Sequence, residues 1–380
     1  MGSLKFLPII MICRGGILMS KNRNNTAALI LIFSICFSLF FLIYHEHAKS
    51  KTSSVYEKIA KKHDIHYLIV GDSIGRGAGV VNRSLTWFSQ WEKEMKKSYQ
   101  INLTRHSVVQ SGATAYEGLY LFKKAKTPPS TDLVFLIFGE NDRKYMNEKQ
   151  FAYYYEGLIR EIKTKYPDAE LITITESCLE QDQFANKIKK LSNHYQANHI
   201  DMRIPFQHSA YPIAQLTADF VHPNGLGYKL YADSILAAIA KGLENGKQAA
   251  VLKEPILYTK ELKIKEFTQY NEINDLFQVK NGYYIANEKG ARITYPFNGT
   301  NLGVKVLKHE QGGKIDVYID NQFVRRISTW WPIHKNRVLY VTSDLPAGEH
   351  KVTFISTGTK SVHNKSRYPN IQLSSIVVYE

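Results

Sequence analysis

Cysteine is scarce in this sequence, whose 380 residues include only three. Cys13 and Cys36 lie before or inside a long apolar run near the N-terminus, which leaves Cys178 alone in the rest of the chain. A single cysteine has no partner within its own chain, so we expect no disulfide in the part that follows the apolar run.

The sequence also lacks the motifs of metal, cofactor and nucleic-acid binding. Its 13 histidines are scattered, without the spacing of ligands around a metal ion. It has no glycine-rich loop of the phosphate-binding type and no nucleic-acid-binding module. We therefore expect no metal site, no cofactor and no nucleic-acid partner.

Acidic residues are too few to balance the basic ones. The chain has 34 Asp and Glu against 49 Lys and Arg, which gives a formal net charge of +15. A basic surface attracts anionic polymers or lipids, and a negatively charged cell-wall glycan is the partner that we expect. The alternative is a lysine-rich solvated surface, of the kind that residues 187–190 would form.

A long uncharged apolar run occupies residues 27–44. It is just long enough to span a bilayer core of about 30 Å, and Lys21 and Arg23 before it favour a cytoplasmic N-terminus. The alternative is a cleaved signal peptide, whose apolar stretch is usually about 7–15 residues. We predict a cytoplasmic segment at 1–26, a transmembrane anchor at 27–44, a polar stalk at 45–62 and an extracellular remainder.

Two patterns follow the stalk. Residues 63–245 alternate apolar runs with helical periodicity, which is typical of a parallel sheet wrapped by helices. After a linker at 246–255, residues 256–380 contain short β-rich runs separated by Gly, Asn and Asp, which indicate a β-sandwich. The predicted fold class is therefore α/β with a C-terminal, jelly-roll-like module.

The expected elements can be placed by residue number. Residues 319–322 indicate a hairpin turn in the second domain. The expected helices are 85–99, 148–165, 183–197 and 225–243; the expected strands are 66–70, 101–109, 133–138, 170–175, 199–202, 282–285, 291–297, 302–307, 314–320, 337–341, 350–355 and 371–379.

Four short motifs fall beside these elements. The sequence Val70-Gly-Asp-Ser-Ile-Gly-Arg-Gly77 would lift the Ser73 hydroxyl onto a tight turn after a buried strand. Gln-Ser-Gly-Ala at 110–113 and Gly-Glu-Asn-Asp at 139–142 follow two other strands, and Asp-Phe-Val-His-Pro-Asn at 219–224 precedes a helix. Because active sites of α/β sheets lie outside the carboxyl ends of the strands, all four motifs can meet there.

These blocks, in this order, resemble the SGNH (GDSL-type) hydrolase superfamily over roughly residues 63–245. The resemblance implies that Ser73 is a nucleophile and His222 the base that takes its proton. Asp219 lies three residues before the histidine, so on a turn its carboxylate can reach the other imidazole nitrogen. The alternatives are that His222 starts a helix and that Asp219 caps it.

The resemblance also implies an oxyanion hole made by the backbone N–H groups of Ser73 and Gly112 and the side chain of Asn141. The family usually has Asn-x before this glycine, whereas here Gln110-Ser111 precede Gly112. Alternatively, Asn141 makes only an Asx-turn.

The second domain is similar to carbohydrate-binding-like modules that accompany SGNH domains. Trp330 and Trp331 are adjacent, so on a strand they would point to opposite faces, and an exposed one could stack on a sugar. The alternative is that they belong to the core.

The family resemblance implies acyl transfer through an acyl-serine. With the anchor, the basic charge and the β-module, the chain resembles Gram-positive O-acetyltransferases of peptidoglycan and cell-wall polysaccharide. We expect an extracytoplasmic O-acetyltransferase that receives acetyl groups from a multi-spanning membrane acyltransferase. The alternatives are a carbohydrate or lipid esterase that uses water and a non-catalytic protein that binds wall glycan.

Overall fold

The computed structural model describes residues 53–258 and 262–379. The predicted cytoplasmic segment at 1–26 and the predicted anchor at 27–44 lie outside these residues. Within the described ranges, no helix is both long enough and apolar enough to cross a bilayer.

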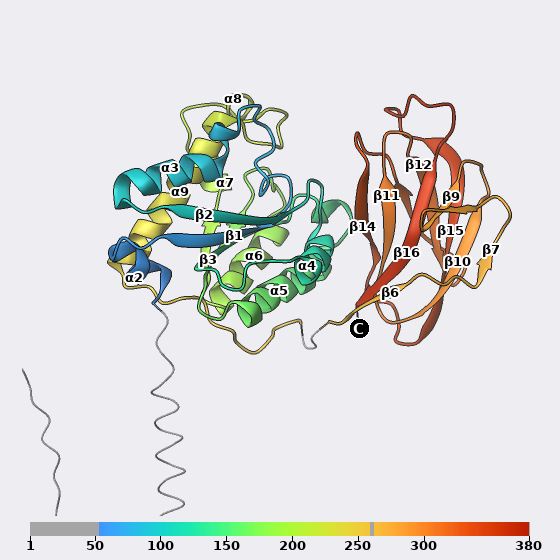
Figure 1. The fold of residues 1–380 in the computed structure, drawn as a ribbon, viewed down its shortest axis with the longest axis horizontal. Helices are drawn as coiled ribbons and strands as arrows, with labels where there is room; N and C mark the ends of the chain where they lie inside the picture. Colours follow the sequence, from blue (N-terminus) through green and yellow to red (C-terminus); the bar gives the residue numbers. More distant parts are fainter. Residues whose placement is uncertain (1–52, 259–261, 380) are drawn as a thin grey trace, which may run out of the picture. The chain divides into compact units, whose positions relative to one another are not determined.

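A parallel sheet forms the centre of the first domain (Figure 1). Its strand order is β2-β1-β3-β4-β5, and every neighbouring pair is parallel, as the alternating pattern predicts. The strands are β1 (Ile65–Gly71), β2 (Leu103–Val109), β3 (Leu133–Ile137), β4 (Glu170–Thr175) and β5 (Asn198–Asp201). The helices are α2 (Val55–Ala60), α3 (Trp87–Tyr99), α4 (Ala115–Lys124), α5 (Glu148–Lys165), α6 (Asp182–His194), α7 (Arg203–Gln207), α8 (Ile213–Leu216) and α9 (Gly225–Glu244), with short 3₁₀ turns at Arg83–Leu85 and Asp142–Lys144.

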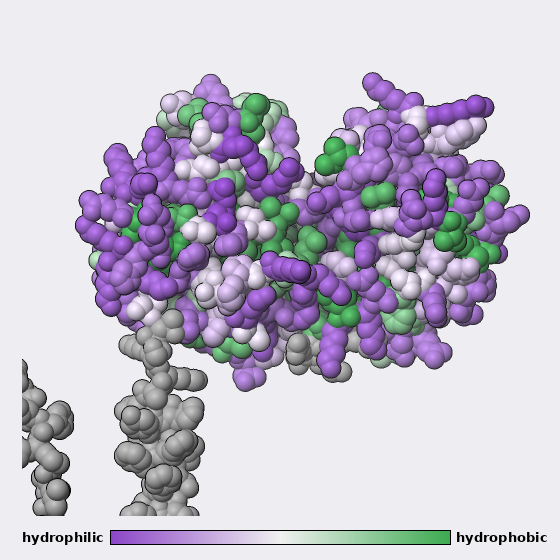
Figure 2. Space-filling view, in the orientation of Figure 1, coloured by the Kyte–Doolittle hydropathy of each residue, from purple (hydrophilic) through white to green (hydrophobic). Residues whose placement is uncertain are grey.

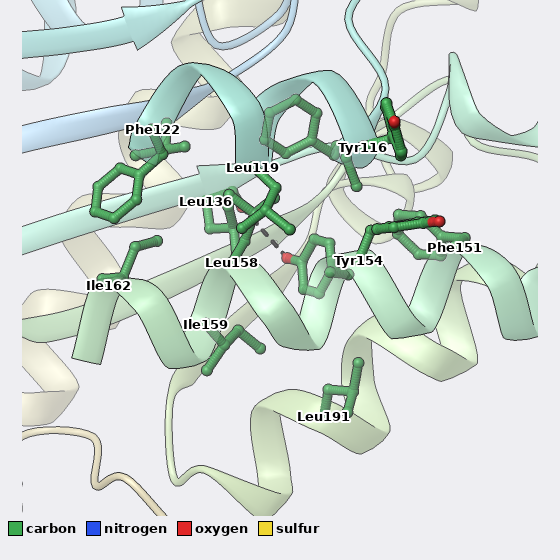
Figure 3. Close-up of a cluster of buried hydrophobic side chains, with 14 of the residues drawn as sticks. Tyr116, Leu119, Phe122, Leu136, Phe151, Tyr154, Leu158, Ile159, Ile162 and Leu191 are labelled. Atoms are coloured by element: carbon green, nitrogen blue, oxygen red, sulfur yellow. Dashed lines mark hydrogen bonds between the residues drawn. The ribbon is translucent and has the colours of Figure 1, made fainter. Parts of the chain in front are cut away.

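Helices cover both faces of this sheet. Successive β1 residues point to opposite sides, so Leu68 joins the core beneath α4, α5 and α6 while Ile69 joins the core beneath α2, α3 and α9. Figure 3 shows the first of these cores, where Leu119 of α4 and Leu158 of α5 pack beside Leu136 of β3. Burial on both faces explains why the central strands are continuous apolar runs.

The segment predicted as a stalk is partly folded. Residues 55–60 form α2, which buries Val55, Tyr56 and Ile59 against the sheet. The Tyr56 hydroxyl donates to Glu170 Oε1 at 3.2 Å. The polar residues of this segment concealed three apolar residues on one helix face, so the α/β domain includes residues that were predicted to form a stalk.

The predicted linker at 246–255 also packs on the first domain. Lys247 forms an ion pair with the buried Glu170, and Ala250 is itself buried. The Glu156 carboxylate accepts hydrogen bonds from the backbone N–H groups of residues 256–258 at 2.6–2.8 Å. Buried carboxylates are normally hydrogen-bonded, and here the segment supplies the donors, which holds it against the first domain.

Antiparallel strands form the second domain, which is sandwich-like as predicted (Figure 1). One sheet has the order β13-β12-β15-β10-β7 and the other β14-β11-β16-β9-β8, with β6 paired to β16, and their inner faces enclose an apolar core. The strands are β6 (Ile264–Phe267), β7 (Glu272–Ile273), β8 (Gln278–Lys280), β9 (Tyr283–Ala286), β10 (Arg292–Asn298), β11 (Leu302–Lys308), β12 (Gly313–Ile319), β13 (Gln322–Ser328), β14 (Lys335–Thr342), β15 (Glu349–Lys360) and β16 (Ile371–Tyr379).

The predicted hairpin at 319–322 joins β12 to β13. Asp320 and Asn321 both have positive φ, 49° and 66°, which is the backbone of a type I′ turn.

The two domains belong to one compact unit and share a buried interface. The Tyr116 hydroxyl of α4 donates to the carbonyl of Val377 at 2.9 Å, and the Tyr379 hydroxyl donates to the carbonyl of Tyr116 at 2.9 Å. Gly303 of β11 approaches the Tyr116 ring so closely that a Cβ there would lie 2.5 Å from it.

In the face drawn in Figure 2, hydrophilic residues cover most of both domains.

Candidate active site

Ser73 lies in the turn that follows β1, with only 7% of its surface exposed. Asp72 supports the turn because its Oδ1 accepts from the Ile74 N–H at 2.9 Å. The indole N–H of Trp87 donates to the Ile74 carbonyl at 3.0 Å from the first residue of α3. The serine hydroxyl is therefore held at the carboxyl end of a central strand.

His222 and Asp219 lie beside this serine. His222 Nε2 is 3.0 Å from Ser73 Oγ, and His222 Nδ1 is 2.7 Å from Asp219 Oδ2. The three predicted residues therefore form a continuous hydrogen-bonded line, in which the imidazole can accept the serine proton and the carboxylate can stabilise the resulting imidazolium.

A short hairpin-like loop presents the histidine. Thr217 and Pro223 form an isolated antiparallel bridge, and the Ala218 N–H donates to the His222 carbonyl at 2.8 Å. Phe220 adopts a φ of +65°, a conformation that is uncommon for a bulky residue. Asn224, and neither Asp219 nor His222, caps α9, so the alternative helix-start interpretation of these two residues is wrong.

The Asp219 carboxylate is set to remain ionised. Burial acts to raise its pKa, but hydrogen bonds from the backbone N–H and the ring of His222 outweigh burial and hold the pKa below its usual value. The Asp219 side chain is 54% exposed, so its charge remains partly solvated. The charged carboxylate can still orient the imidazole through its contact with Nδ1.

The predicted oxyanion donors lie at the same place. Gly112 has a φ of +74° and lines the pocket with Ser73 and Asn141. In the described part of the chain, the backbone N–H groups of Ser73 and Gly112 donate to no protein acceptor. Asn141 Nδ2 donates to Asp72 Oδ2 at 2.7 Å, and an amide nitrogen with two hydrogens retains one for a ligand.

Gly79 is a further requirement of this geometry that the sequence motifs did not reveal. Its φ is +102°, and a Cβ there would lie 2.4 Å from the Pro223 carbonyl oxygen and 2.9 Å from His222 Cβ. We expect Gly79→Ala to lower kcat at least about tenfold, because small displacements of a catalytic group have large effects on rate. Steady-state kinetics on a chromogenic ester would measure the change.

Gly246→Ala is the matched control for this prediction. Gly246 also has a positive φ of 58°, but a Cβ there meets no atom within 4 Å. It should lose stability slightly and keep its kcat. Equal activities of the two variants would show that Gly79 does not position His222.

Three carboxyl groups are buried beneath the serine turn: Asp72, Asp142 and Glu176. Burial raises the pKa of Asp72 to about 6 and raises the pKa of Glu176 well above its usual value, with the neighbouring Asp72 charge adding to the effect on Glu176. Burial likewise raises the pKa of Asp142 to about 8. Asp142 Oδ1 accepts from the Ala115 N–H at 2.7 Å, which ties this loop to the start of α4.

Asp142 makes stability depend on pH. A carboxyl with a pKa of about 8 in the folded chain and about 3.9 in the unfolded chain binds a proton on folding. Its contribution is fully present below about pH 4 and is lost as the pH rises through about 8. We therefore expect Asp142→Asn to raise the melting temperature relative to the parent more at pH 9 than at pH 5. Asp275→Asn, at an exposed position, is the matched control and should show no such trend.

A pocket of about 630 Å³ opens at the serine and receives walls from both domains. The α/β domain contributes Ser73, Gly112, Asn141 and His222, and the sandwich contributes Lys308, Arg326, Trp331, Arg337 and Tyr340. The second domain is therefore part of the site itself.

The two adjacent tryptophans have different surroundings. Trp331 lines the pocket, and its ring tip lies 3.4 Å from where a Cβ on Gly112 would be. Trp330 does not line this pocket; its ring packs on His363 with centroids 4.9 Å apart. Of the two predicted sugar-stacking residues, the structure brings only Trp331 to the site.

Arg337 of β14 links the sandwich to the oxyanion region. Its guanidinium, 2% exposed, pairs with the equally buried Glu117 of α4 at 2.6 Å. The same Nη2 donates to the Gly112 carbonyl at 2.9 Å. Sequence reasoning missed this contact because residues 225 positions apart carry no local signal of it.

One cluster in the described residues offers metal-type ligands, although the sequence led us to expect none. Ligand atoms of His309, Glu310 and His334 all lie within 4.8 Å of one another. His309 is buried, and its Nδ1 already accepts from the Gln311 N–H at 3.3 Å. The other two residues of the cluster, Glu310 and His334, are exposed.

Comparisons with known proteins show what the two domains are similar to. The model described as "GDSL-like Lipase/Acylhydrolase family" matches residues 69–230, the segment that contains all three residues of the hydrogen-bonded line. The match supports the GDSL/SGNH hydrolase superfamily for the α/β domain.

Solved structures share the fold of both domains. A two-domain esterase described as active on acetylated mannans is 18% identical, with a TM-score of 0.63, over 86% of this chain and 94% of its own. A second structure of it was co-crystallised with mannopentaose and matches with the same TM-score. At this identity the likeness shows the fold alone.

A curated relative matches a short stretch. The "A type blood alpha-D-galactosamine galactosaminidase" of Flavonifractor plautii is 28% identical over 85 residues, which are 22% of this chain and 8% of that protein. The chain thus spans a small fraction of this relative.

Proposed function

Because the α/β domain is a serine enzyme of the GDSL/SGNH type, we propose that the chain moves O-acetyl groups of a polysaccharide through an acetyl-serine at Ser73. The observation that carries the proposal is the line from Ser73 through His222 to Asp219, which opens into a pocket walled by the second domain.

The geometry suits a two-step reaction. His222 Nε2 takes the proton of the Ser73 hydroxyl as Oγ attacks the acetyl carbonyl carbon. The negative oxygen of the tetrahedral intermediate is met by the N–H groups of Ser73 and Gly112 and by the Asn141 amide. The intermediate collapses when the bond to the leaving oxygen breaks and His222 returns the proton to that oxygen.

The second step reverses these roles. His222 takes a proton from an acceptor hydroxyl, which attacks the acetyl-serine carbonyl, and Ser73 leaves with the proton restored. When the acceptor is a sugar hydroxyl, the enzyme is an acetyltransferase; when it is water, the enzyme is an esterase. The same side chains serve both reactions.

Several features support a polysaccharide as the substrate. Trp331 gives the pocket an aromatic wall of the type that stacks on sugar rings, and the pocket is roomy enough for more than one ring. The structurally similar two-domain esterase acts on acetylated mannans. The formal charge of +15 favours an anionic polymer such as a cell-wall glycan.

Acetyl transfer onto an extracytoplasmic cell-wall polysaccharide is the activity that we propose first. It combines this site with the predicted anchor at residues 27–44 and with a membrane acyltransferase as the acetyl donor. The second candidate is a carbohydrate esterase, which is favoured by the fold shared across both domains with an esterase.

One experiment separates these candidates. The full-length chain in detergent would receive p-nitrophenyl acetate, with and without a wall-derived oligosaccharide, and both nitrophenol and acetylated sugar would be quantified. Acetylated sugar with slow hydrolysis in its absence supports the transferase. Fast hydrolysis without acetylated sugar supports the esterase, and activity that survives in Ser73→Ala contradicts both.

A further inference from the structure

Lys308 is a residue of the pocket that has no part in the reaction described above. It is the last residue of β11, and it lines the same pocket as Ser73 and His222. Its ammonium lies 5.2 Å from the centroid of the Trp331 ring. Among the described residues, no hydrogen-bond or ion-pair partner meets this ammonium.

The other cations of the pocket are compensated. Each of them forms an ion pair with a carboxylate: Arg337 with Glu117 at 2.6 Å, Arg326 with Asp316 at 2.6 Å, and Lys144 with Glu140 at 3.4 Å. Lys144 shares Glu140 with Arg143, which lies 2.6 Å from the same carboxylate. Within the described part of the chain, Lys308 is therefore the pocket cation whose charge no carboxylate balances.

The lack of a counter-charge affects the pKa of Lys308. Its pKa is lowered to about 8, chiefly by burial; the positive charge of Arg337 adds to this lowering, and the nearby Glu117 opposes it less strongly. Glu117 gives little relief because it already binds the Arg337 guanidinium and the Val338 N–H. A desolvated ammonium without a counter-charge is unfavourable unless a ligand supplies the anion.

We propose that Lys308 binds an anionic group, a carboxylate or a phosphate, carried by the glycan chain whose acetyl ester reaches Ser73. The proposal rests on the proposed polysaccharide O-acetyl chemistry and adds the substrate class to it. Trp331 would hold a sugar ring beside the ammonium. The same wall of the pocket would therefore bind the ring through Trp331 and its anionic group through Lys308.

The test compares matched substrates with the full-length chain. Acetylated oligosaccharides would be neutral, carboxylate-bearing (uronic acid) or phosphate-bearing, and kcat/KM would be measured for each at pH 7. We expect the parent to prefer at least one charged substrate over the neutral one. In Lys308→Met this preference should fall about tenfold or more, because charge-assisted contacts in a desolvated site are strong.

Two further variants sharpen the result. Lys280→Met removes the same charge from an exposed strand outside the pocket and should retain the preference. Lys308→Arg keeps a cation whose charge persists to high pH. In the parent, the preference should disappear as the pH rises through about 8, where Lys308 loses its proton, and in Lys308→Arg it should persist at pH 9.

Using the ratio of charged to neutral substrate cancels any effect of pH on the reaction steps that the two substrates share. A parent that hydrolyses or transfers acetyl groups but shows no charge preference, or keeps it in Lys308→Met, overturns the role of Lys308 alone. A parent that is inactive on every acetyl ester overturns the proposed function. Preference for the carboxylate or for the phosphate identifies which anion the site takes.

Discussion

Ser73→Ala is expected to lower kcat by about 10⁵–10⁶-fold, as loss of the nucleophile does in other serine enzymes. The hydroxyl lies 3.0 Å from His222 Nε2, so the substitution removes the nucleophile that this imidazole is placed to activate. The measurement is steady-state hydrolysis of p-nitrophenyl acetate, with unfolding followed by circular dichroism to verify that the fold is retained.

Asp219→Asn is expected to lower kcat less than Ser73→Ala does. The amide keeps the size of the side chain but favours the wrong tautomer of His222, so kcat should fall by up to about 10⁴-fold. The double variant Ser73→Ala/Asp219→Asn should be no slower than Ser73→Ala, because residues that act as one unit are not additive. Activity of Ser73→Ala above about 1% of the parent would remove this serine from the mechanism.

Arg337→Met is expected to have the largest effect on stability. Removing one partner of a buried ion pair leaves the other charge uncompensated, which costs about 3–5 kcal/mol. Here Glu117 would remain with 2% exposure at the junction of the two domains. Urea denaturation would measure the free energy of unfolding.

The double variant Glu117→Gln/Arg337→Met separates stability from positioning. It removes the isolated charge, so much of the lost stability should return. The kcat should stay low, because the hydrogen bond from Arg337 to the Gly112 carbonyl is absent in both variants. Full recovery of kcat in the double variant would show that Arg337 does not position the oxyanion glycine.

The sequence predicts those parts of the fold whose signals are local. The helix α5 and the strands β4 and β16 have the bounds expected from periodicity, 148–165, 170–175 and 371–379. The helix α2 was not predicted, because its apolar residues lie within the polar segment 45–62. The strand β13 was not predicted, because its sequence Gln-Phe-Val-Arg-Arg-Ile-Ser does not alternate apolar with polar side chains.

The residues of the candidate site likewise divide into those with a local sequence signal and those without one. Ser73, His222 and Asp219 could be named from the sequence, because each lies in a short motif at the end of a strand or before a helix, and the parallel sheet brings such ends together. Gly79 could not be identified from a motif. A side chain is excluded there by atoms of His222 and Pro223, which lie more than 140 positions away in the chain.

The sequence by itself therefore determined a serine enzyme domain and a β-rich second domain, because catalytic motifs and strand periodicity are properties of neighbouring residues. Only the tertiary structure decided that Trp331, Arg337 and Lys308 complete the pocket of Ser73. Those contacts arise from the packing of one domain on the other, and burial and charge at such an interface depend on which surfaces meet in three dimensions.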